Sequence, residues 1–492
     1  MGRLRVVKRV IEYITVEPVW MLGIIGLTIR MLIQPAGIYL RVCEEEYDAR
    51  DDIRCDDKTT WPKDVETFIQ KTSADWDIYV TISYLIPAIF ASTALGAWSD
   101  LAGRQINMLA SLAGLTVAAL GMEWVFSRSV QGHLFWLIPF GLVTGFTGFI
   151  ALLSMACFAY IVDITQDKQL QSIRMTIYYA LGTLSQAVGS VGVSLLSSSV
   201  PLTRLALISQ AAALIAFVYV LLCIKQIPPA MLKTTVHSSN VPKTEKKFTV
   251  SGTVAFVFVL CYDAIKCYVK PRPGHRRAYL AIMAVVIFVA TTTTSEPIQQ
   301  YTFRTSGYGA LGWDIADLAL WTAVTKICIA FLGMPVLVVL KKMDIRDTII
   351  TLLSLSSLGF KWLVVGLATE TWHMYIASVL GCMAELGTAS ILSFMANLVE
   401  PDEVGKLYTV VGFSYELSVI LSKVVFNSIY KATLHFFPGF MFVFAAFLIL
   451  LCDLGSFWIH WKAKQENVGH EPHRPAKAHS IQNNHTDDIK SV

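Results

Sequence analysis

Apolar segments recur along almost the whole chain, and their length restricts the folds that it can adopt. An α-helix needs about 20 mostly apolar residues to cross a hydrocarbon core of about 30 Å. Of the 492 residues, 54% are hydrophobic and 15% are charged, whereas average soluble proteins hold about 25% charged residues. We therefore predict an all-α membrane protein with twelve transmembrane helices, near residues 17–39, 77–98, 106–126, 133–160, 174–198, 203–226, 277–300, 314–340, 347–368, 372–397, 406–430 and 437–460.

The distribution of charge between the segments predicts how the chain is oriented, because Lys and Arg are retained on the cytosolic side of a membrane. Residues 41–75 hold eleven acidic and six basic side chains, so we expect an outer loop there. Residues 225–277 hold ten Lys and Arg against two acidic side chains, and residues 1–13 are also basic, so we expect both in the cytosol. Twelve spans then place both termini in the cytosol. The net charge of +4 reflects this asymmetry and indicates no nucleic-acid partner.

The basic middle connection divides the chain into two halves of six spans, which is typical of carriers built from repeats. We expect a six-helix bundle over residues 1–226 with the outer loop, and a second over residues 277–461. The linker 227–276 is either disordered or carries a helix that lies in the cytosolic interface. The polar tail 462–492 is expected to be disordered and cytosolic.

A short turn between the second and third apolar segments carries Asp100, Gly103 and Arg104. Asp163 and Arg174 flank the connection between the fourth and fifth segments, on the same predicted side. Charge-assisted hydrogen bonds among these residues would favour one closed state, so we expect a gating latch. The alternative is that the charged residues only keep the loop ends hydrated.

Several motifs resemble a known family. The run Leu95-Gly96-Ala97-Trp98-Ser99-Asp100, followed by Gly103-Arg104, resembles the signature between spans two and three of the major facilitator superfamily. Further runs resemble solute carrier family 46, namely Val16-Glu17-Pro18, residues 156–163 before Arg174-Met175, residues 426–430 with Ala432-Thr433, and Pro438-Gly439-Phe440.

The resemblance implies the major facilitator fold and a secondary active transporter that works by alternating access. It further implies import of an organic anion, which would be folate-like, a muropeptide, a steroid conjugate or a cyclic dinucleotide, with H⁺ as the coupling ion. The implied location is the plasma membrane or the lysosomal membrane. Three positions depart from the folate-carrying branch, with Tyr179 in place of a Glu, Thr291 in place of a His and Leu392 in place of an Arg. We therefore expect another cargo, and we place Tyr179 in the substrate site.

Charged residues inside spans are functional candidates, because an unpaired charge in the membrane costs several kcal/mol. Arg30 lies midway along the first span and could bind a carboxylate or phosphate through two hydrogen bonds. The alternative is a structural ion pair with Glu123, Glu385 or Glu416. We predict that Arg30 contacts an anionic substrate.

Proton coupling requires a carboxylate that gains and loses a proton as access alternates. Glu296, just before Pro297, and Glu385 in the tenth span are the candidates for this role and for substrate binding. Lys326 or Lys361 could pair with either carboxylate, which would make that carboxylate structural.

The nine cysteines form an odd set, and Cys43 and Cys55 alone share the outer loop. In the family that the chain resembles, a first-loop Cys bridges to a Cys within a Leu-Cys-Trp-Asp run. This chain reads Leu311-Gly312-Trp313-Asp314 there, so the resemblance leaves Cys43 as the partner of Cys55. Two free thiols remain the alternative.

Other protein classes find little support in the sequence. No phosphate-binding loop, zinc-protease motif or nucleophile elbow occurs, so we predict no enzyme, no cofactor and no metal site. A drug-type exporter would need a Gly-Pro pair in the fifth span, and residues 180–194 contain no proline. A membrane receptor or scaffold that keeps the carrier fold without transporting is the remaining alternative.

Overall fold

The computed structural model describes residues 15–468, apart from 48–52, 56, 57, 59, 60, 128–131, 166, 167, 227–265, 295–297, 306–308, 401, 402 and 467. At residues 97, 100–102, 168, 169, 172, 173, 405, 406 and 409 it describes the backbone only. The described residues form helices, and no strand lies among them. Most of the predicted linker and tail lies outside the described residues.

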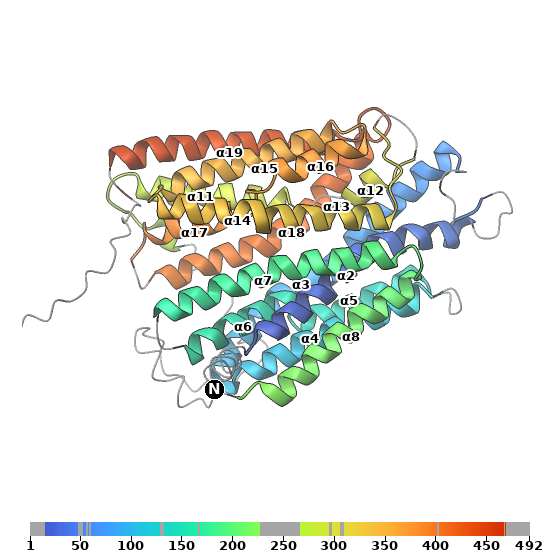
Figure 1. Ribbon diagram of the computed structural model, residues 1–492, viewed down its shortest axis with the longest axis horizontal. Coiled ribbons are helices and arrows are strands. Elements are labelled where there is room, and N and C mark those ends of the chain that lie inside the picture. Colours follow the sequence, from blue (N-terminus) through green and yellow to red (C-terminus); the bar gives the residue numbers. More distant parts are fainter. Residues whose placement is uncertain are drawn as a thin grey trace, which may run out of the picture.

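The apolar runs of the first half fold into helices, because a lipid interior offers no other partner for backbone N–H and C=O groups. They are α2 (Glu17–Tyr47), α3 (Lys63–Ala102), α4 (Arg104–Val125), the 3-10 helix η2 (Leu134–Trp136), α5 (Leu137–Phe146), α6 (Phe149–Ile164), α7 (Lys168–Leu196) and α8 (Leu202–Cys223). We call α2 to α8 the first bundle. Helices α2 and α3 are 31 and 40 residues long, and they project beyond their neighbours at one end of the molecule (Figure 1).

The second half of the chain forms a second bundle that lies beside the first (Figure 1). Its helices are α11 (Arg276–Thr292), α12 (Ile298–Thr302), α13 (Ile315–Cys328), the π-helix η3 (Ile329–Gly333), α14 (Met334–Lys342), α15 (Asp347–Gly366), α16 (Thr371–Leu380), α17 (Gly387–Ala396), α18 (Val404–Thr433) and α19 (Phe440–Gln465).

Ten helical segments of the described chain are long and apolar enough to cross a membrane. The other two predicted spans are helical but shorter. Helix α11 has 17 residues, and the tenth predicted span is divided into α16 and α17, each of 10 residues. The chain is thus an all-helical, multi-pass membrane protein.

Glycines bring neighbouring helices of the first bundle into backbone contact. A Cβ atom on Gly145 would lie 2.4 Å from the carbonyl oxygen of Tyr84, so α5 approaches α3 at a distance that only glycine permits. Gly148 adopts a left-handed φ of 81° and separates α5 from α6, which bends the fourth predicted span.

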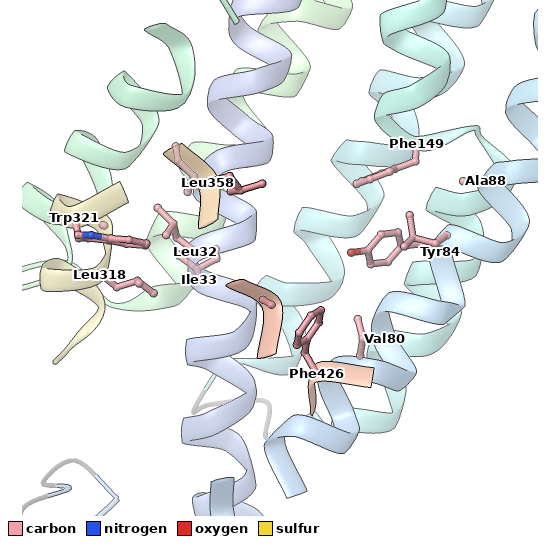
Figure 2. Packing of buried hydrophobic residues seen from close by; sticks show 14 of the residues in the cluster. Leu32, Ile33, Val80, Tyr84, Ala88, Phe149, Leu318, Trp321, Leu358 and Phe426 are labelled. Atoms are coloured by element: carbon pink, nitrogen blue, oxygen red, sulfur yellow. The ribbon is translucent and has the colours of Figure 1, made fainter. Parts of the chain in front are cut away.

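Apolar side chains fill the contact between the bundles. Leu32 of α2 lies beside Leu318 and Trp321 of α13, and Phe426 of α18 lies beside Val80 of α3 (Figure 2). These contacts come from α2 and α3 on one side and from α13 and α18 on the other, so these four helices form part of the surface that the bundles share.

Candidate substrate and gating sites

An ion pair and hydrogen bonds join the two bundles at the end where α2 and α3 project. We call it the disulfide end. Asp77 of α3 is 2% exposed and forms an ion pair with Lys423 of α18, with 2.8 Å between Oδ2 and Nζ. The Tyr430 hydroxyl donates to the Gln70 side chain of the first bundle at 3.3 Å, and the Asn427 amide donates to the carbonyl of Ala74 at 3.3 Å. Contacts of this kind hold the two bundles together at the disulfide end.

The loop after α2 adds further contacts at this end. A disulfide joins Cys43 to Cys55, the pairing that the sequence left open against free thiols. The Lys58 ammonium lies 4.0 Å from the ring centroid of Phe303 in the second bundle and 5.4 Å from that of Tyr39 in the first. Burial lowers the pKa of Lys58 to about 8, although Asp314 and Glu66 act in the opposite direction. Lys58 therefore links the two bundles through aromatic rings.

The predicted turn lies at the opposite end, which we call the Arg104 end. Arg104 Nε donates to Asp163 Oδ2 at 3.0 Å, and Arg104 Nη1 donates to the Ser99 hydroxyl at 2.7 Å. Gly103 has a φ of 98°, which permits the sharp turn between α3 and α4. Asp100 lies in the last turn of α3, and its side chain is not among those described. Two of the proposed latch residues, Arg104 and Asp163, are thus joined across helices.

Arg174 forms a separate pair. Its Nη2 lies 2.8 Å from Glu17 Oε1, and both side chains are buried. The Thr165 and Thr15 hydroxyls accept two further hydrogen bonds from the same guanidinium. Arg174 therefore ties α7 to the start of α2. Sequence reasoning missed Glu17 as its partner, although the Val16-Glu17-Pro18 motif marked the position.

Arg30 is a buried cation in the middle of α2, and it is 3% exposed. Its guanidinium carbon lies 5.0 Å from the Tyr84 ring centroid and 5.4 Å from that of Phe149, and Figure 2 shows these two rings side by side. Nε and Nη1 are buried without a hydrogen-bond partner. None of the three carboxylates that the sequence offered pairs with Arg30 among the described residues.

An unpartnered guanidinium inside a membrane is unfavourable, and contacts with aromatic faces offset only about 0.5–2 kcal/mol of that cost. Most buried polar groups in proteins have a hydrogen-bond partner, so each exception calls for an explanation. Arg30 offers two N–H groups in the planar arrangement that suits a carboxylate, sulfate or phosphate.

Glu385 pairs with Lys326, as the structural alternative allowed. The Lys326 ammonium of α13 donates to Glu385 Oε1, which lies in the non-helical segment between α16 and α17. Lys361 lies within electrostatic range of Glu385, and its ammonium is 4.6 Å from the ring centroid of Trp362. The second bundle thus carries a charged cluster inside the predicted spans.

Tyr179 lies on α7 and is 59% exposed. Its ring packs against Phe158 at 5.1 Å between centroids, and its hydroxyl is within electrostatic range of Tyr408 of α18. Both tyrosines are exposed although their helices belong to different bundles. Tyr179 therefore packs on Phe158 at the surface of the first bundle and lies within electrostatic range of the second.

The predictions for Glu296 and for metal binding complete the set of site predictions. Glu296 lies outside the described residues. No group of three or more His, Cys, Asp and Glu side chains within the described segments could hold a metal ion.

Ionic contacts also hold together the second bundle near the start of α18. Lys270 and Arg272 bond the two oxygens of Glu403 at 2.7 and 2.6 Å. Burial raises the pKa of Glu403, but the hydrogen bonds from these two cations outweigh burial and hold it at about 2.

Comparison with known proteins identifies the type of molecule that carries these sites. The profile of the Major Facilitator Superfamily matches residues 62–422. A proton-coupled folate transporter of Rattus norvegicus is 26% identical over 79% of this chain and 78% of its own. A lysosomal proton-coupled steroid conjugate and bile acid symporter of Gallus gallus is 22% identical over 89% of this chain and 92% of its own.

A solved structure shows the same fold. The human organic anion transporter MFSD10 superposes with a TM-score of 0.56 at 14% identity, covering 90% of this chain and 97% of that one. The relatives are membrane transporters and not enzymes. The resemblance to solute carrier family 46 is confirmed, and the chain belongs to the Major Facilitator Superfamily.

Proposed function

We propose that this chain is a secondary active carrier that imports an organic anion by alternating access, with proton entry as the driving force. Arg30 carries the proposal. It is a buried guanidinium with two unpartnered N–H groups in the middle of α2, one of the helices that contact the second bundle. A substrate carboxylate, sulfate or phosphate would supply the missing acceptors.

The proposed orientation places the disulfide end outside the cytosol and the Arg104 end in the cytosol, with twelve spans and both termini cytosolic. The acidic loop at residues 41–75 and the Cys43–Cys55 disulfide support this, since disulfides persist on the oxidising side of a membrane. The closed disulfide end then corresponds to an inward-facing state. Opening it requires the Asp77–Lys423 pair to separate.

The Arg104–Asp163 pair is proposed as the cytosolic gate, and Asp100 and Gly103 as parts of the same turn. Arg174 would act with Glu17 by fixing α7 to α2 at that gate. Tyr179, exposed toward the second bundle, is proposed to contact the substrate on its path to the cytosol.

The cargo is proposed from the names of the relatives, which transport folate in one case and steroid conjugates and bile acids in another. Glutamate, histidine and arginine positions of the folate-carrying branch are Tyr179, Thr291 and Leu392 in this chain, which favours a cargo other than folate. The membrane would be the plasma membrane or that of the lysosome.

An uptake screen tests the proposal. Cells that display the chain at their surface would be offered folate, a muropeptide, a steroid sulfate, a bile acid and a cyclic dinucleotide at neutral and mildly acidic external pH. We expect at least one anion to accumulate, faster at acidic pH, and its uptake below the wild-type KM to slow with Arg30→Gln at equal surface amounts. A surface-displayed chain that takes up none of these anions would contradict a carrier of this class.

A further inference from the structure

The Lys326–Glu385 pair joins two helices at the points where both leave regular α-geometry. Lys326 lies in the last turn of α13, and the π-helix η3 begins three residues later. Glu385 lies in the non-helical residues between α16 and α17. A Cβ atom on Gly333 of η3 would lie 2.1 Å from the carbonyl oxygen of Cys382, so the two irregular segments pack against each other. Both features are typical of functional sites in membrane carriers.

Side chains of α15 stabilise the break in the tenth predicted span. The Ser354 hydroxyl donates to the carbonyl oxygens of Met383 at 2.8 Å and Ala384 at 3.0 Å, and the Ser357 hydroxyl donates to that of Leu380. A break inside a membrane persists only where such partners satisfy the freed backbone groups. The segment that carries Glu385 is therefore a defined part of the fold.

The two members of the pair differ in exposure. The Glu385 side chain is 43% exposed, whereas the Lys326 side chain is 17% exposed. Around Glu385 lie Lys326 of α13, Lys361 of α15, and Tyr415 of α18, which is itself within electrostatic range of Glu416. Helices α13 and α18 both contact the first bundle. Glu385 therefore carries an exposed carboxylate beside two helices that contact the first bundle, and a proton can reach it there.

A proton on Glu385 would change the charge of the cluster. While Glu385 is ionised, its negative charge neutralises the Lys326 ammonium. Once an oxygen of Glu385 takes up H⁺, the carboxyl group is neutral, and Lys326 is left as a largely buried cation without a counter-charge on that atom. Such a cation inside a span is unfavourable unless an anion replaces the lost partner.

We propose that Lys326 is a second substrate-binding cation, made available to the organic anion only when Glu385 is protonated. The proton and the anion then bind together, and release of the proton to the cytosol lets Glu385 displace the anion from Lys326. This inference rests on the proposed carrier function and explains how its two cargoes are coupled. Arg30 binds independently of pH, and Lys326 supplies the part of the affinity that depends on pH.

Binding to the purified full-length chain in detergent tests the inference separately from transport. Thermal stabilisation by folate, taurocholate and inorganic sulfate would be titrated at neutral and acidic pH. For the wild type we expect about 10- to 100-fold tighter binding of at least one probe at acidic pH, the size of one charge-assisted bond. Glu385→Gln mimics the protonated carboxyl, so it should bind tightly at both pH values. It should also exchange substrate across liposomes without accumulating it.

Two further variants complete the test. Lys326→Gln should bind weakly at both pH values, and the double variant Lys326→Gln/Glu385→Gln should do the same while leaving no unpaired charge that could disturb folding. The inference is overturned if Glu385→Gln keeps the pH dependence, if Lys326→Gln keeps it, or if no probe stabilises the wild type more at acidic pH. If one of these results is obtained and the wild type still takes up the anion, the carrier function remains supported and only this coupling mechanism is rejected.

Discussion

Replacing Arg30 by Gln removes the charge that we propose binds the substrate anion. Nε and Nη1 are free to donate, and each charge-assisted hydrogen bond to an anion contributes about 1.5–3 kcal/mol. Drawing the guanidinium away from the rings of Tyr84 and Phe149 costs about 1–2 kcal/mol. The net loss is about 2–4 kcal/mol, which corresponds to about 30- to 700-fold in affinity because 1.4 kcal/mol is a factor of ten.

The assay is the initial rate of uptake of the transported anion at increasing concentration, normalised to the amount of protein at the surface. We expect Arg30→Gln to raise KM by the factor given above. The KM of Arg30→Lys should lie between those of the wild type and Arg30→Gln, because lysine keeps the charge and loses the planar pair of donors. Arg204→Gln, on the exposed side of α8, is the matched control and should leave KM unchanged. A KM for Arg30→Gln within about twofold of the wild type would refute the assignment of the anion site. A twofold change corresponds to much less free energy than the 1.4 kcal/mol of a tenfold change.

Three further predictions concern the two ends of the molecule and its stability. Asp163→Asn weakens the bond to Arg104, so we expect transport to slow by about 10- to 100-fold with substrate binding unchanged, the range of one charge-assisted bond; an unaltered rate would argue against a gate there. Exchanging the charges of Asp77 and Lys423 in a double variant should restore the transport that either single reversal abolishes, and failure to restore it would show that the pair does not close the disulfide end. Glu403 has a depressed pKa of about 2, so its contribution to stability is present above its usual pKa of about 4.5 and is lost as pH falls toward 2. The difference in melting temperature between the wild type and Glu403→Gln should shrink over that interval, and a constant difference would contradict the ion-pair explanation.

Much of the fold could be predicted from the sequence, because the length of an apolar run decides whether it crosses a membrane. The breaks within the helices could not be predicted from the sequence. Nothing in the apolar pattern of residues 372–397 marks the break between α16 and α17, since the break depends on hydroxyls that α15 supplies from a distant part of the chain.

For the candidate sites, the charged residues could be predicted from the sequence, but their partners could not. Arg30 and Glu385 were predicted because a charge inside an apolar run is visible in the sequence itself. The partners were not visible. Asp77 and Lys423 meet only because α3 and α18 pack together, and their separation of 346 residues leaves no local signal. Arg174 was assigned to the same latch as Asp163, whereas the packing of α7 against α2 pairs it with Glu17.

Proton-driven import of an organic anion can be tested in proteoliposomes that contain only this chain. An inward proton gradient would be imposed, and the accumulation of an organic anion from the screen would be followed with and without a protonophore. We expect accumulation above the external concentration that collapses when the protonophore is added, and slower accumulation with Arg30→Gln at anion concentrations below the wild-type KM. Accumulation that is unaffected by the protonophore, or an absence of anion uptake by correctly inserted protein, would contradict it.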